Sequence, residues 1–196
     1  MTTLTTPTPP PPTATPPPPN PLTTALRHAA PALAAYLTVR LISLAALATW
    51  AHRRHHGVRP ILSQEWDAKW YWGIATHGYT HTLGTAYDAN NLAFFPLYPY
   101  LVKTLSAITH LSLPSTGLAV ALTSSLLAAW GIFAIGDHLH DRRTGTLLTV
   151  LWAAWPVALV QWMAYTESLF TALAAWSLYA TLTQRWLPAA TLATLA

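Results

Sequence analysis

Four long apolar segments constrain the fold of this chain more than any other feature. The clearest is 114–135, which contains no charged residue, and two more follow it at 146–164 and 165–184. The fourth, at 31–51, is interrupted only by Arg40. About 20 apolar residues in a helix cross the hydrocarbon core of a bilayer, and helices satisfy their own backbone hydrogen bonds in lipid. We therefore expect an all-α fold, a polytopic membrane helix bundle.

The composition agrees with a membrane protein. Charged residues make up 8% of the chain and apolar residues 53%, whereas soluble domains carry about 25% charged residues. The chain contains no cysteine, which excludes disulfides and Cys-ligated metal sites. The net charge of +4 comes from basic residues scattered at the ends of apolar segments. This scatter favours membrane lipids with anionic head groups as partners and argues against nucleic acid.

The two ends of the chain differ from these apolar segments. Residues 1–21 contain ten of the seventeen prolines and no charged residue, so we expect a disordered proline-rich tail over 1–28. A membrane domain is expected over 29–196. Its last apolar run begins at Leu187 and continues for ten residues, about half the length that a span requires. This ending predicts that the sequence is the N-terminal part of a longer protein.

A long connection, 52–113, separates the first two predicted spans and exceeds the usual length of a helix connection. It contains the aromatic motif WDAKWYWGIATHGY at 66–79 and the motif NLAFFPLYPYLVK at 91–103. The range 92–108 is apolar but carries two prolines and a lysine. These residues favour a helix that lies on the membrane surface, and a further span is the alternative.

Asp67 is the first candidate for chemistry. It stands between tryptophans in an apolar segment, where partial desolvation raises the free energy of its charged form. A carboxylate in such a place can act as a general base. Trp66 and Tyr71 belong to the rings that could offer flat faces to a sugar or a prenyl chain. The alternative is an aromatic belt at the membrane surface whose aspartate faces water.

Glu167 and Arg40 are the other ionisable candidates. Glu167 begins the 165–184 segment, where an acid is either functional or favoured by the helix dipole alone. If 92–108 does not cross the membrane, the chain returns after two spans and Glu167 can share a site with Asp67. Arg40 lies in the middle of a predicted span, so we expect it to pair with an acid of another span or with a phosphate.

The histidines and acids do not predict a metal site. His77 and His81 have helical spacing, but no HExxH glutamate accompanies them. Asp67 has no DxD partner and only Glu65 nearby. The motif DHLHDRR at 137–143 is typical of a solvated connection between spans. We therefore expect no obligatory metal or other cofactor, although a divalent metal remains an alternative.

Three motifs in order resemble a known family. The WDAKWYW motif, the FFPLYP motif and the YTESLF motif that begins at Tyr165 resemble the PIG-V family of membrane mannosyltransferases. Its bacterial members are similar to GPI mannosyltransferase 2 and belong to the GT-C class. The resemblance runs from about Arg40 to Leu187. It implies a GT-C-like bundle with an extracytoplasmic first loop bearing interfacial helices.

The resemblance also implies a reaction. The enzyme would transfer mannose from a polyprenyl-phosphate carrier to a lipid- or protein-linked acceptor at the outer face of the cell membrane. The N-terminal tail would then be cytoplasmic, an orientation that the Lys and Arg residues beside the spans do not decide. Asp67 is the catalytic base that the resemblance implies, and the expected substrate-binding residues are Trp66, Tyr71, Arg40, Lys69, Glu167, Phe95, Pro96 and Tyr98.

Non-catalytic membrane proteins remain the alternative class. A transporter-like subunit would also bury Arg40 and Glu167, but transporters commonly show an internal repeat and none is visible in this sequence. A structural partner subunit accounts for the hydropathy. It gives no reason for a long aromatic connection with Asp67 in it.

Overall fold

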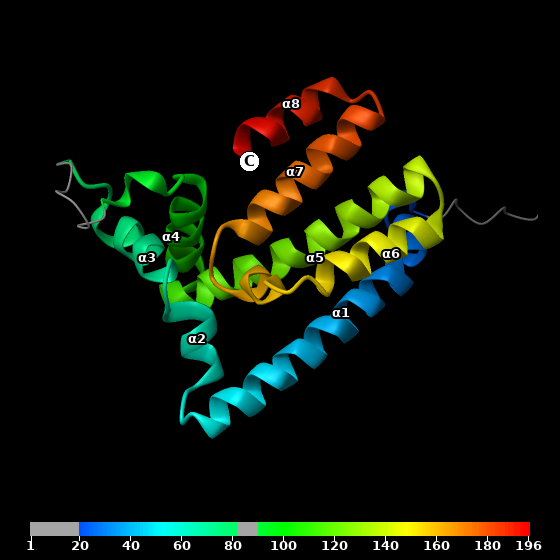
Figure 1. Cartoon of the computed structure of the whole chain (residues 1–196). Helices are drawn as coiled ribbons and strands as arrows, with labels where there is room; N and C mark the ends of the chain where they lie inside the picture. Colours follow the sequence, from blue (N-terminus) through cyan, green and yellow to red (C-terminus); the bar gives the residue numbers. More distant parts are fainter. Residues whose placement is uncertain (1–19, 82–89) are drawn as a thin grey trace, which may run out of the picture.

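The computed structural model describes residues 20–81 and 90–196. Within these ranges every regular element is a helix, so the all-α class is confirmed. The helices, in chain order, are α1 (Pro21–Arg53), α2 (Val58–Gln64), α3 (Ala68–His77), the short 3₁₀ helix η1 (Asn91–Ala93), α4 (Leu97–Thr109), α5 (Leu113–Leu139), α6 (Arg142–Ala153), the 3₁₀ helix η2 (Ala158–Trp162), α7 (Glu167–Leu182) and α8 (Trp186–Leu195) (Figure 1).

The first helix is longer than the sequence predicted. The side chain of Asn20 accepts a hydrogen bond from the backbone N–H of Leu22 at 2.9 Å, and Pro21 occupies the first turn. Both features favour a helix start. The predicted tail boundary at residue 28 is therefore wrong, because 21–28 are helical. The remainder of the predicted tail, 1–19, lies outside the described residues.

Two of the described helices, α1 and α5, are long and apolar enough to cross a membrane. They contain the predicted segments 31–51 and 114–135. The later segments do not give spans of the predicted length. The 16 residues of α7 extend about 24 Å and the ten of α8 about 15 Å, whereas the hydrocarbon core is about 30 Å thick.

The predicted span 146–164 is not one helix. Asp141 accepts a hydrogen bond from the backbone N–H of Thr144 at 2.7 Å and caps the start of α6. The helix ends at Ala153, and η2 follows after a short irregular stretch. Proline cannot donate a backbone hydrogen bond and disfavours helical geometry in the residue before it. Pro156 therefore accompanies a complete break where the sequence predicted a kink.

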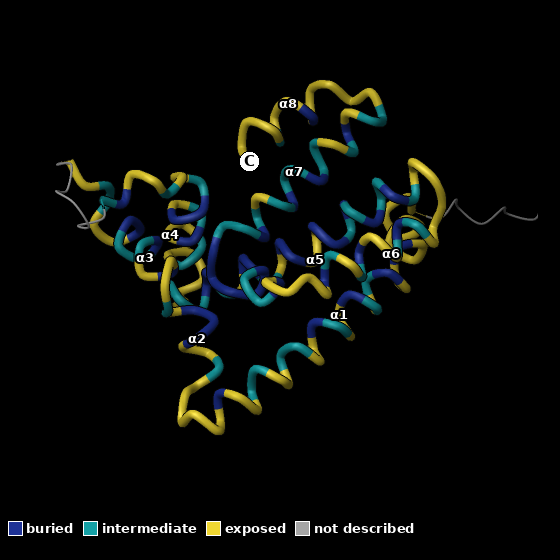
Figure 2. The backbone as a smooth tube through the Cα atoms, viewed as in Figure 1, coloured by how far each residue is buried: buried dark blue, intermediate teal, exposed yellow. Residues whose placement is uncertain are grey.

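Helix α5 is the centre of the bundle and packs against α1, α6 and α7 (Figure 1). Buried positions lie along these facing surfaces (Figure 2). The largest hydrophobic cluster of the described residues lies where the short helices α2, α3 and α4 meet the start of α5, and it contains Leu62, Tyr71, Tyr98, Val102 and Val120. His28 of α1 and Asp137 of α5 approach to 3.0 Å, so the beginning of α1 lies beside the end of α5. Gly136 and Gly145 allow the backbones of α5 and α6 to touch: a Cβ on Gly136 would lie 2.6 Å from the Cα of Gly145.

The described parts of the connection within 58–81 and 90–109 form a layer of short helices at the end of the bundle where α5 begins (Figure 1). The hydroxyl of Tyr98 in α4 donates to the carbonyl of Gly117 in α5 at 3.1 Å, and the indole of Trp72 in α3 donates to the carbonyl of Ser63 in α2 at 3.0 Å. At 13 residues, α4 extends about 20 Å. It is too short for the alternative in which 92–108 spans the bilayer.

Candidate functional site

Asp67 stands at a sharp corner between α2 and α3. Trp66 before it has φ 47°, in the left-handed region, and α3 begins directly after Asp67. Left-handed geometry is uncommon for a residue with a side chain and is seen most often at functional or tightly constrained positions. The corner leaves Asp67 exposed. The indole of Trp66 is 64% exposed, so it does not form a buried wall beside this carboxylate.

The chain returns to this corner about a hundred residues later. The backbone N–H of Ala164 donates to the carbonyl of Leu62 at 2.7 Å, and the hydroxyl of Tyr165 donates to the carbonyl of Glu65 at 3.2 Å. These bonds fix the stretch between η2 and α7 against α2. Glu167, the first residue of α7, is therefore held near the Asp67 corner. The two carboxylates are far apart in sequence and neighbours in the fold.

The electrostatics of Glu167 reflect this arrangement. Burial raises the pKa of the Glu167 carboxyl, and the negative charge of Asp67 raises it further. The Oε2 atom of Glu167 is buried and has no hydrogen-bond partner among the described residues. Such an acceptor is costly to leave unsatisfied. Glu167 therefore has an unused acceptor that a hydroxyl or another hydrogen-bond donor would satisfy.

Two tyrosines complete the cluster. Burial raises the pKa of the Tyr71 hydroxyl, and the charges of Glu167 and Asp67 add to the effect. Burial also raises the pKa of Tyr165 to about 12. Both phenols therefore keep their protons at neutral pH and remain hydrogen-bond donors. We call Asp67, Glu167, Tyr71 and Tyr165 the carboxylate cluster.

An aromatic core lies behind the carboxylate cluster. The ring of Tyr71 packs edge-on against Phe94 and Tyr98, with centroid separations of 5.1 and 4.9 Å. Tyr98 is fully buried. These two predicted substrate-binding tyrosines are therefore packing residues in this structure, and Tyr71 reaches the cluster with its hydroxyl end only.

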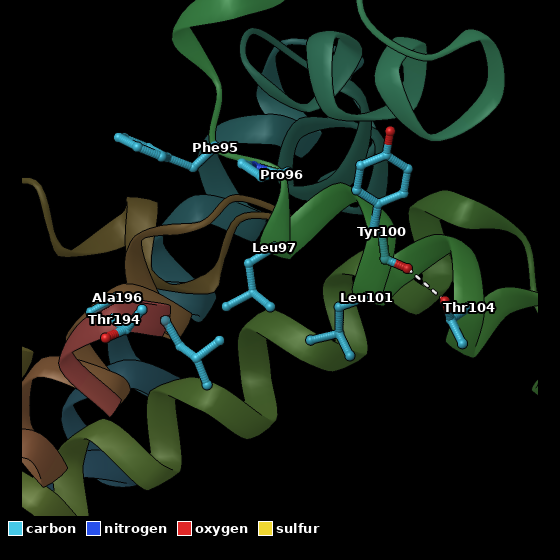
Figure 3. A pocket seen from close by; sticks show the side chains of 9 residues that line it. Phe95, Pro96, Leu97, Tyr100, Leu101, Thr104, Thr194 and Ala196 are labelled. Atoms are coloured by element: carbon cyan, nitrogen blue, oxygen red, sulfur yellow. Dashed lines mark hydrogen bonds between the residues drawn. The ribbon is translucent and has the colours of Figure 1, made fainter. Parts of the chain in front are cut away.

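Phe95 and Pro96 lie at a different place. They line an apolar cavity of about 660 Å³ between the start of α4 and the end of α8 (Figure 3). Neither Asp67 nor Glu167 is among its lining residues. The side chain of Phe95 is 77% exposed. The size and the apolar lining of this cavity suit an acyl or prenyl chain, since ligand pockets commonly measure about 300–1,000 Å³.

The two predicted cations also separate. Lys69 forms an exposed ion pair with Glu65 at 3.3 Å, one helical turn from it. It therefore lies on the same corner as Asp67. Arg40 is buried in α1, where its guanidinium lies 5.1 Å from the ring centroid of Trp162. Its charge is not among the causes that shift the pKa of Glu167 or of Tyr71. The structure does not bring Arg40 to the carboxylate cluster.

Sequence reasoning missed two residues that shape this region. Tyr165 was noticed only as the first letter of the YTESLF motif, although its hydroxyl fixes the corner. Asn91 is buried, accepts from the backbone N–H of Thr80 at 2.9 Å and donates to the carbonyl of Gly78 at 3.1 Å. It joins the end of α3 to η1. The polar Asn90 and Asn91 ahead of an apolar run were the available signal.

Within the part of the chain that the structure describes, no group of three or more His, Cys, Asp or Glu residues is placed to hold a metal ion. Comparison of the chain with family models, with curated proteins and with solved structures finds no match. The resemblance to PIG-V mannosyltransferases therefore depends on the three sequence motifs alone.

Proposed function

We propose that this chain carries the catalytic base of a membrane glycosyltransferase that moves a hexose, mannose by the resemblance, from a polyprenyl-phosphate carrier to a lipid- or protein-linked acceptor. One observation carries the proposal. The buried Oε2 of Glu167 has no hydrogen-bond partner among the described residues and lies in the field of Asp67. An unpaired acceptor beside a second carboxylate fits a substrate that brings its own hydroxyl groups.

The two carboxylates suit different tasks. Asp67 is exposed at the corner, where it can reach an incoming acceptor and accept its proton. Glu167 is partly buried and binds a hydroxyl of the sugar through Oε2. The acceptor oxygen forms a bond to the anomeric carbon as the bond from that carbon to the phosphate oxygen breaks. The acceptor proton passes to Asp67, and the carrier phosphate leaves with the bonding electrons.

Lys69 is the cation that serves the departing phosphate. It lies two residues from Asp67, and its exposed ammonium forms an ion pair with Glu65 at 3.3 Å. A nearby cation stabilises the negative charge that develops on a leaving group. Arg40 does not share this role in the proposal, because its guanidinium is held against Trp162 inside the bundle.

The membrane placement follows from α1 and α5. Both cross the bilayer in this proposal, and the layer of α2, α3 and α4 lies at one surface of it. A lipid-linked donor presents its phosphate at that level, while its prenyl chain enters the apolar cavity beside Phe95 and Pro96. The resemblance assigns this layer to the outer face.

The test is mannosyl transfer by membranes that contain the protein, with synthetic polyprenyl-phosphate mannose as donor. Asp67→Asn keeps the size of the side chain and removes the base. We expect it to lower the rate by about 10² to 10⁴, the usual contribution of a positioned base. Asp137→Asn, at the far end of α5, is the matched control and should retain the wild-type rate. Full transfer by Asp67→Asn contradicts the assignment of the base.

A further inference from the structure

Arg40 is a buried cation that forms no ion pair with any described acid. Its side chain is 1% exposed, and its Nε atom has no hydrogen-bond partner among the described residues. The ion pairs of the described residues, His28 with Asp137 and Lys69 with Glu65, do not include it. An ionised group removed from water is costly unless it is paired and hydrogen-bonded. This guanidinium therefore lacks a counter-charge.

The contacts of Arg40 compensate only one side of its charge. Tyr36, one turn earlier on the same face of α1, accepts a hydrogen bond from the indole of Trp162 at 3.1 Å. That bond holds the Trp162 ring against the guanidinium. A cation–π contact attracts the charge through the face of the ring. It does not satisfy the N–H groups along the edge of the guanidinium.

A cavity of about 320 Å³ lies beside Arg40. It exists because α6 ends at Ala153 and the chain around Pro156 leaves the helical path. The cavity is open to the outside, and Trp155 on its wall is 64% exposed. No acidic residue is among its lining residues, which include Arg40, Ser43, Trp50, Ala154, Trp155 and Leu159.

The depth of Arg40 in the membrane decides which anion can reach it. Arg40 stands twelve residues from His28 and twelve from His52, the polar residues that bound the apolar part of α1. At 1.5 Å per residue, each end is about 18 Å away, and half of the hydrocarbon core is about 15 Å. The guanidinium is therefore near the bilayer centre. Lipid phosphates lie at the surface, whereas a side chain on a crossing helix can lie at this depth.

We propose that the cavity beside Arg40 receives the carboxylate of an Asp or Glu in the middle of an apolar membrane helix from a partner protein. The ion pair would satisfy the guanidinium, and apolar residues that line the cavity, the exposed Trp50 and Trp155 among them, would pack against the partner helix. The proposal rests on the membrane placement of α1 that the proposed function also uses.

Within the described residues, a second copy of this chain offers no such carboxylate. The described acids all lie at helix ends or between helices and none is central in a long apolar helix: they are Glu65, Asp67, Asp137, Asp141 and Glu167. The remaining acid, Asp88, stands in the polar stretch YDANN of the sequence and not in an apolar run. The partner is therefore a different polypeptide. Its defining chemistry is one acid near the centre of an apolar span of about 20 residues.

The experiment measures binding of synthetic membrane helices to the full chain in phosphatidylcholine vesicles by energy transfer. The probes are three leucine–alanine helices that differ only at one central position, which is Asp, Asn or Leu. We expect the Asp helix to bind at least tenfold more tightly than the Leu helix. Arg40→Gln should abolish this preference and Arg40→Lys should retain part of it.

Two further variants separate pairing from folding. Ala154→Trp fills the cavity and keeps Arg40, so it should also abolish the preference for the Asp helix. Arg27→Gln removes an exposed cation near the start of α1, away from the cavity, and should leave the preference unchanged. Circular dichroism of each variant shows whether the helices are intact.

Equal binding of the Asp and Leu helices to the wild-type chain overturns the proposal. Binding of phosphatidic acid that depends on Arg40, without any preference for the Asp helix, overturns it in favour of a lipid phosphate. The proposed function fails by a different result, because it depends on Asp67. Asp67→Asn should keep the preference for the Asp helix, and Arg40→Gln should keep mannosyl transfer.

Discussion

The residues of the carboxylate cluster show how burial divides tasks between two similar side chains. Asp67 stands on an exposed corner, whereas Glu167 begins a packed helix and has a buried oxygen without a partner. The cost of burying a charge raises the pKa of Glu167. The unsatisfied oxygen of Glu167 lowers the stability of the free protein, and a substrate hydroxyl could donate a hydrogen bond to it. Such a compromise is common where function competes with stability.

The raised pKa of Glu167 predicts how stability depends on pH. Above the ordinary value of 4.5, the unfolded chain releases a proton that the folded protein still holds. The free energy of unfolding therefore falls as pH rises from 4.5 through the raised pKa, and the loss is complete above it. Glu167→Gln removes this loss. Its melting temperature in detergent should exceed that of the wild type at about pH 8 and match it at about pH 4.

The control for this prediction is Glu65→Gln. Its exposed carboxylate pairs with Lys69, and surface changes of this kind usually alter stability by less than about 0.5 kcal/mol. A melting-temperature difference between Glu167→Gln and the wild type that is the same at both pH values would show that burial of the charge is not its cause.

At the scale of the elements, the contact between α5 and α6 depends on the absence of side chains. A Cβ at Gly136 would lie 2.6 Å from the Cα and 2.9 Å from the N of Gly145. Both are backbone atoms of a packed helix and cannot rotate away. Small residues commonly permit this close approach between membrane helices.

Gly136→Ala should therefore force α5 and α6 apart. We expect it to lower the free energy of unfolding by about 1–3 kcal/mol, the usual cost of overpacking. The matched variant is Gly73→Ala in α3, where an added Cβ meets no atom within 4 Å. It should be neutral or stabilising by up to about 1 kcal/mol. Thermal unfolding of both variants in detergent checks the difference, and equal melting temperatures would contradict the backbone contact.

At the scale of the whole molecule, α1 and α5 are the two described helices long and apolar enough to cross a membrane. His28 in α1 pairs with Asp137 near the end of α5, whereas the layer of α2, α3 and α4 connects the opposite ends of the same two helices (Figure 1). If both helices cross the bilayer, every residue of that layer lies on one side. The α5–α6 connection lies on the other.

The chain contains no cysteine, so single cysteines can report these sides. We expect His56→Cys and His110→Cys to react with a membrane-impermeant maleimide added to intact cells, because the resemblance assigns their layer to the outer face. Leu139→Cys should react only after the membrane is permeabilised. Labelling of all three in intact cells would contradict the crossing of α5, and the reverse pattern would contradict the orientation.

The sequence by itself determined the helical class and the two long apolar helices. These depend on local composition, because a long apolar run without charges favours a helix whatever surrounds it. It also marked Asp67 and Glu167 as unusual, since ionisable residues in apolar segments are rare and costly. It did not predict that α1 begins at Pro21, because the cap formed by Asn20 is a single local hydrogen bond.

Only the tertiary structure decided which of the marked residues meet. The hydrogen bonds that fix Ala164 to Leu62 and Tyr165 to Glu65 join segments about a hundred residues apart, and no local pattern encodes such a contact. The same long-range packing separates Arg40 from the carboxylate cluster and places it beside the break at Pro156. The sequence gives the chemistry of each side chain directly. Whether two side chains form a site depends on the distance between them, and packing across the whole chain determines that distance.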